Sequence, residues 1–98
     1  MNENQILDKA IRTYGIDTQI DKAVEEMAEL IKALMKLRHC EKGYEHQILQ
    51  DAVDEEIADV EIMLQQLRMI FNDFGSVEHQ RKKKIERLER RLNGENRR

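Results

Sequence analysis

Glycine and proline end helices, and their distribution sets the limits of what this 98-residue chain can form. The sequence has no proline, and its four glycines stand far apart, at positions 15, 43, 75 and 94. Each follows a stretch with helical spacing of apolar residues, and a glycine just beyond a helix end can take the left-handed conformation that closes it. Because 38% of the residues are charged and 4% are aromatic, these stretches are typical of long helices with charged outer faces. We therefore predict an all-α protein of four helices.

The apolar spacing gives approximate bounds for these helices. The first covers roughly residues 2 to 14, the second begins after Asp17-Thr18 and runs to about Cys40, the third runs from about Glu45 to Phe74, and the fourth follows Gly75-Ser76. The two central helices are long, and we expect them to lie antiparallel. A chain of this length is a single domain, residues 1–98, at a size where one core supplies modest stability. We therefore expect a four-helix-bundle core built with a partner subunit, in a homodimer or homotetramer.

Charge and termini exclude several classes of protein. The net charge is −3, and acids gather in the central helices while bases predominate after Arg81, so we do not expect a nucleic acid as partner. The first residues are polar, without the pattern of a signal peptide, and no apolar run is long enough to span a bilayer. The single Cys40 has no partner for an intramolecular disulfide. We expect a cytoplasmic protein with no membrane contact.

Acidic residues interrupt the apolar faces of both central helices. On a helical wheel Glu26 falls inside the apolar arc of the second helix, and Glu29 lies at its edge. Glu56 lies near the middle of the stripe of the third helix, with Asp59 at its margin. A buried carboxylate costs several kcal/mol unless a cation compensates its charge. Oxygen ligands from two neighbouring helices suit a hard divalent cation such as Mg²⁺, which we predict here.

Taken together, Glu25-Glu26-x-x-Glu29 followed by Glu56-x-x-Asp59 resembles the signature of the MazG-like, all-α nucleoside triphosphate pyrophosphohydrolases, a superfamily related to the dimeric dUTPases. The match covers both central helices. Residues 14–19 and 84–88 also look like those of small phage and Firmicute members. The resemblance implies hydrolysis of a nucleoside triphosphate to the monophosphate and pyrophosphate, as in the removal of unwanted nucleotides from the cellular pool.

The resemblance also implies roles for particular residues. Glu26, Glu29, Glu56 and Asp59 take the positions of the Mg²⁺ ligands, with Mn²⁺ as an alternative ion. Glu25 and Glu26 form the doubled glutamate to which we assign catalysis, Glu25 binding a further ion or orienting the attacking water. Lys84 and Arg87 match the family's late Lys-x-x-Arg and would bind the outer phosphates.

Several alternatives stay open from the sequence. An enzyme of narrow, dUTPase-like specificity fits the same motifs, as does a degenerate member that binds nucleotide without turnover. A helical interaction module that uses its fourth helix on nucleic acid is the alternative from another class. His39, Cys40 and His46 match no standard zinc spacing. The preferred base and sugar, the number of ions and the role of Arg81 are not fixed by the sequence.

Overall fold

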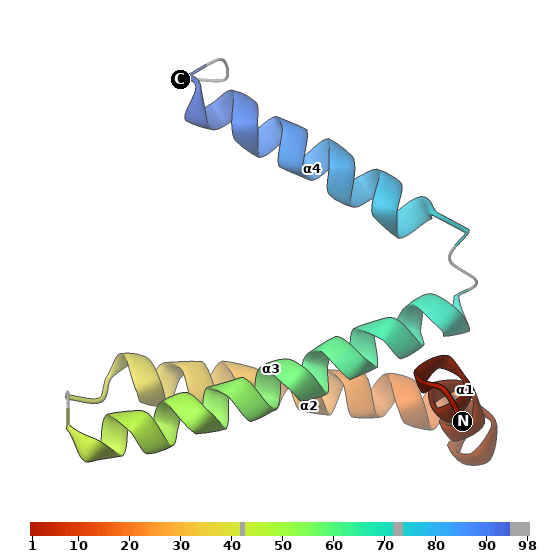
Figure 1. The fold of residues 1–98 in the computed structure, drawn as a ribbon, viewed down its shortest axis with the longest axis horizontal. Coiled ribbons are helices and arrows are strands. Elements are labelled where there is room, and N and C mark those ends of the chain that lie inside the picture. Colours follow the sequence, from red (N-terminus) through yellow and green to blue (C-terminus); the bar gives the residue numbers. More distant parts are fainter. Residues whose placement is uncertain (42, 72–73, 95–98) are drawn as a thin grey trace.

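The chain folds into four α-helices and, within the residues described, no strand (Figure 1). A computed structural model describes residues 1–41, 43–71 and 74–94. The helices are α1 (Glu3–Tyr14), α2 (Ile16–Arg38), α3 (Tyr44–Ile70) and α4 (Ser76–Leu92). None of them is both long enough and apolar enough to cross a membrane. The prediction of an all-α protein with four helices is confirmed.

Local chemistry explains where the first two helices begin and end. At the start of α1 the Asn2 side chain accepts a hydrogen bond from the Gln5 backbone, and the Gln5 side chain accepts one from the Asn2 backbone, which is a capping box. Gly15 separates α1 from α2 with φ of 94°, a conformation that residues with a side chain rarely adopt. Because α2 begins directly after this glycine, Asp17 and Thr18 lie inside its first turn, and their predicted place before the helix was wrong.

The core is a seam between α2 and α3, which pack along each other as an antiparallel hairpin (Figure 1). Ala23 of α2 and Val53 and Met63 of α3 are buried in it. The short α1 lies across one end of the hairpin, where Leu7 is buried and its carbonyl accepts a hydrogen bond of 3.4 Å from the Gln66 side chain. The contacts along the seam set the axial register of α2 against α3.

The hairpin has two chemically different faces. Val24, Ile31 and Met35 of α2 are exposed and rotated about 100° from buried Ala23 in one sense, and Glu29 is rotated in the opposite sense. Ile57 and Leu64 of α3, and Phe71 just beyond its end, are rotated from buried Met63 in that first sense, whereas Asp59 and the exposed Ile62 are rotated in the opposite one. In an antiparallel pair, equal rotational senses point to the same face, so one face is apolar and the other carries these acids together with Lys22 and Ile62. The apolar face consists of Val24, Ile31, Met35, Ile57, Leu64 and Phe71.

The single chain is less compact than an ordinary monomer of its size. In Figure 1, α4 runs away from the hairpin, and an ion pair between Arg68 and Glu78 joins its start to α3. The radius of gyration is 17.4 Å, against about 13 Å for a compact chain of this length. The accessible surface is 8148 Å², against about 5,900 Å² for a folded monomer of this mass. Each chain thus exposes an excess of about 2,300 Å², an area suited to association.

Candidate metal centre

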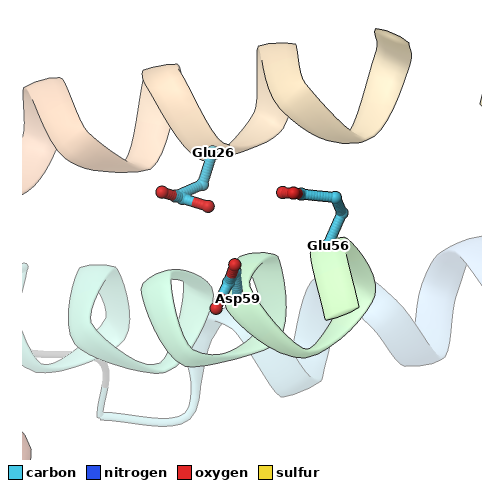
Figure 2. A group of neighbouring side chains, drawn as sticks. All are labelled: Glu26, Glu56 and Asp59. Carbon is cyan, nitrogen blue, oxygen red and sulfur yellow. The ribbon is translucent and has the colours of Figure 1, made fainter. Parts of the chain in front are cut away.

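Three carboxylates converge between the two helices of the hairpin (Figure 2). Glu26 extends from α2 toward α3, and Glu56 and Asp59 extend from successive turns of α3 toward Glu26. One oxygen from each lies within 4.8 Å of the others. The register of the hairpin brings these residues together, although 30 positions separate Glu26 from Glu56 along the chain.

Little in the chain compensates the charge of this cluster. The side chain of Glu26 is 15% exposed, and its Oε1 lies 3.4 Å from Nζ of Lys22, one helical turn away. Lys22 is itself 53% exposed, so solvent screens that ion pair. The Oε2 of Glu56 is buried and has no hydrogen-bond partner among the described residues. A buried, unpartnered carboxylate oxygen is costly, which makes it the feature of the cluster that most requires a ligand.

The electrostatics of the cluster act on Glu56. Burial disfavours its charged form and raises the pKa of its carboxyl, and the negative charges of Glu26, Asp59, Glu29 and Glu55 raise that pKa further. A cation placed among the three carboxylates would reverse the second effect by replacing repulsion with attraction. A bound cation would thus both lower the pKa of the Glu56 carboxyl and give its unpartnered oxygen a ligand.

The donor set fits a small hard cation. Carboxylate oxygens are the ligands that Mg²⁺ and Mn²⁺ prefer. With bonds of about 2.1 Å, two oxygens on one Mg²⁺ lie about 3 Å apart when adjacent and about 4.2 Å apart when opposite. The three oxygens, which lie within 4.8 Å of one another, would therefore have to approach one another somewhat to bind one ion. Three protein ligands leave positions open for water or phosphate oxygens.

The other two acids of the Glu25-Glu26-x-x-Glu29 motif lie outside this cluster. Glu29 is 46% exposed, and its Oε1 is 3.7 Å from Nζ of Lys32, which draws the carboxylate toward solvent. Its charge still acts on Glu56, so it lies near the cluster without sharing it. Glu25 is exposed on α2. Of the four predicted metal ligands, the structure brings together Glu26, Glu56 and Asp59 and leaves Glu29 beside them.

The predicted phosphate-binding residues occupy a different part of the chain. Lys84 and Arg87 lie on α4, where both are exposed. The shallow hollow that they border is lined by α4 residues alone. Within one chain, therefore, the described residues do not bring Lys84 and Arg87 to the acidic cluster.

Two buried glutamines were not predicted from the sequence. Gln19 and Gln66 are 4% and 3% exposed, and Gln66 holds α1 against α3 through the Leu7 carbonyl. A signal for Gln66 was present, because it lies three residues after Met63 and four before Ile70 on the inner side of the third helix. Polar residues at core positions of an amphipathic helix thus mark contacts between elements as well as candidate metal ligands.

Comparisons with known protein families, with curated proteins and with solved structures found no match to this chain.

Proposed function

We propose that this chain is a Mg²⁺-dependent nucleoside triphosphate pyrophosphohydrolase of the MazG-like kind, which converts a ribo- or deoxynucleoside triphosphate to the monophosphate and pyrophosphate. The observation that carries the proposal is the buried, unpartnered oxygen of Glu56 beside the carboxylates of Glu26 and Asp59. The order and spacing of the two motifs support the same reading. A substrate drawn from the nucleotide pool would place the protein in the cytoplasm.

Each residue of the centre has a role in this proposal. Glu26, Glu56 and Asp59 would hold the ion, and Glu29 would join them by exchanging its contact with Lys32 for the cluster. The ion would neutralise the triphosphate and lower the pKa of the attacking water. Glu25, which is exposed on α2 immediately before Glu26, would bind a further ion or orient that water. Lys84 and Arg87 bind the outer phosphates.

Assembly is part of the proposal. The apolar face of the hairpin is exposed in the single chain, and an excess surface of about 2,300 Å² matches what each subunit of an obligate homodimer buries. Two hairpins packed by their apolar faces form a four-helix core, with an acidic face on each side of it. We propose a homodimer of this form; a homotetramer would require two dimers to pair through other surfaces.

The test is pyrophosphate release from a panel of ribo- and deoxynucleoside triphosphates, with Mg²⁺, with Mn²⁺ and with chelator. We expect metal-dependent release by the wild-type protein. Glu56→Gln should lower the rate by at least about 100-fold, the loss typical of removing one electrostatic group from an active site. Glu55→Gln is the matched control, because Glu55 is the exposed neighbour on the same helix, and its rate should stay close to wild type.

The outcome also separates the alternatives. Release confined to dUTP would replace the general enzyme by a dUTPase-like one. No release from any nucleotide with either ion, from protein shown to be folded and metal-bound, would refute the proposed activity and favour a nucleotide-binding member without turnover.

A further inference from the structure

A groove lies between α1 and α3, on the side of the hairpin that carries Asp59. Its volume is about 330 Å³, within the range of about 300–1,000 Å³ that is typical of small-molecule sites. Two residues of α1 and four of α3 line it, and half of them are apolar and half polar. The lining residues are Glu3, Leu7, Ala58, Glu61, Ile62 and Gln65. The groove thus combines an apolar surface with a few hydrogen-bonding groups, as ligand sites do.

The groove begins beside the acidic cluster. Ala58 directly precedes Asp59, and Ile62 follows Asp59 by about one helical turn on the same side of α3. Gln65, the last residue of α3 in the lining, is six positions beyond Asp59, or about 9 Å along the helix axis. A molecule held at the cluster by one end could therefore lay its other end in the groove.

The polar groups of the groove select the kind of molecule that it suits. Neither Glu3 nor Glu61 forms an ion pair with another described residue. Two such carboxylates repel phosphate, so the groove does not suit the triphosphate itself. Carboxylates accept hydrogen bonds and donate none, whereas the amide of Gln65 does both. The groove therefore suits an uncharged group that has N–H or O–H donors and an apolar body, as a nucleoside has.

The α1 wall of the groove is held by few contacts. Leu7 is the one buried residue of this helix, and its carbonyl accepts a hydrogen bond from Nε2 of Gln66. At 3.4 Å this bond is longer than the usual length of about 2.9–3.0 Å. The Oε1 of Gln66 is buried and has no partner in the described part of the chain. The wall can therefore adjust to a ligand, and an acceptor next to it is still unused.

The proposed dimer leaves this groove open. Ile62 and Leu64 are rotated in opposite senses from buried Met63, so a partner packed on the apolar face does not cover Ile62. The Ile62 residue is 48% exposed in the single chain. A ligand in the groove would remove this apolar side chain from water, which favours binding.

We propose that the groove between α1 and α3 binds the nucleoside part of the substrate while the phosphates lie at the metal centre, and that it prefers adenine, cytosine and guanine to uracil. The inference rests on the proposed function, because it names the substrate class of the same site. The carboxylate of Glu61 accepts a hydrogen bond from the exocyclic amino group of these three bases. Uracil presents a carbonyl oxygen instead of the amino group of cytosine, and a carboxylate has no proton to donate to it.

The first test compares two ligands on the wild-type protein and does not depend on turnover. The ¹⁵N-labelled chain, with Mg²⁺, is titrated with inorganic triphosphate or with the α,β-methylene analogue of ATP, which lacks the scissile oxygen. Both should shift the amide signals of Glu26 and Asp59. Only the analogue should shift those of Leu7 and Gln65, because it alone carries a nucleoside. Failure of the analogue to shift the Leu7 and Gln65 signals would overturn the inference.

The second test fills the groove. Ala58 is exposed, and Ala58→Trp should weaken binding of the ATP analogue by at least about tenfold and leave binding of inorganic triphosphate within about twofold of wild type. Gln47→Trp is the matched control, because Gln47 is exposed on the same side of α3 about three turns earlier and does not line the groove. Calorimetry gives the four affinities. Equal affinities of the two variants for the analogue would contradict the proposed position of the nucleoside.

The third test addresses the preference among bases. Glu61→Gln replaces an acceptor by an amide that can also donate to the carbonyl oxygen of uracil. The preference for the methylene analogue of CTP over that of UTP should fall by about fivefold, the effect of one hydrogen bond. An unchanged ratio of the two affinities would overturn the role of Glu61.

The outcomes are separable from those of the proposed function. Groove shifts with the analogue, without any pyrophosphate release by the wild-type protein, would refute the activity and retain this inference. Pyrophosphate release without groove shifts, or release confined to dUTP, would overturn the inference and leave an activity in place. Groove signals that change with protein concentration and not with nucleotide would also overturn it and assign the groove to association between chains.

Discussion

At the residue scale, Glu56 combines a buried carboxylate oxygen with a raised carboxyl pKa. It lies on the inner side of α3, where an apolar residue would pack without penalty, and one of its oxygens is buried with no partner in the part of the chain that the structure describes. Its neighbours Glu26 and Asp59 carry the same negative charge, so they further disfavour its ionised form. A residue so placed reduces stability unless it binds something, which is typical of functional rather than structural positions.

The raised pKa of Glu56 predicts how metal-free stability changes with pH. Because the pKa is raised on folding, the folded chain keeps a proton that the unfolded chain has released, and the free energy of unfolding falls as pH rises from the usual carboxyl range through the raised pKa. Glu56→Gln has no proton to lose. With chelator present, urea unfolding at fixed protein concentration should show the variant gaining stability relative to wild type between about pH 4 and pH 8.

Mg²⁺ provides the complementary measurement. At the upper pH it should stabilise the wild-type protein and leave Glu56→Gln unchanged, because only the wild type offers the full ligand set. If, in chelator, the free energy of unfolding of the two proteins changed equally with pH, the raised pKa of Glu56 would be contradicted.

Residue periodicity accounts for what the sequence could predict of the centre. Glu26 and Glu56 interrupt apolar arcs, and a helical wheel finds such positions without knowledge of the tertiary structure. The wheel gives no side-chain rotamer, however, and a side chain at the edge of the arc can point either into the seam or to solvent. Glu29 turns to Lys32, while Asp59, also marginal, joins the cluster.

At the scale of the elements, Gly15 controls the junction between α1 and α2. Its φ of 94° and ψ of 152° lie in a region that is nearly exclusive to glycine, although open space surrounds the position where a Cβ would stand. Gly15→Ala should therefore lower the free energy of unfolding by about 1–3 kcal/mol through backbone strain alone. Gly43→Ala is the matched control: its φ of 166° is extended backbone, and no atom lies within 4 Å of the added Cβ. Urea denaturation of both variants checks the contrast, and equal losses would refute it.

Helix identity was easier to predict than helix placement. Apolar spacing and widely separated glycines define four helices, but the start of α2 depends on a backbone turn at Gly15 rather than on the polar residues that follow it. The third helix ends at Ile70, short of the predicted Phe74. The angle between α3 and α4 could not be predicted from the sequence, because this angle depends on contacts between the helices such as that of Arg68 with Glu78.

At the scale of the whole molecule, the apolar face predicts that assembly depends on its central side chains. Leu64→Glu places a charge in the middle of that face and should weaken association by at least about 30-fold, the effect of losing a contact worth about 2 kcal/mol. Ile48→Glu is the control, because Ile48 is also exposed but lies on another side of α3. Sedimentation equilibrium over a range of concentrations gives both constants. A Leu64→Glu protein that associates as well as wild type would place the interface elsewhere.

The large exposed surface of the single chain has a consequence for cellular abundance under the proposed assembly. If folding and association are coupled, the fraction of stably folded protein rises with the concentration of the chain. The rate of synthesis would then control how much of the protein reaches its stable form.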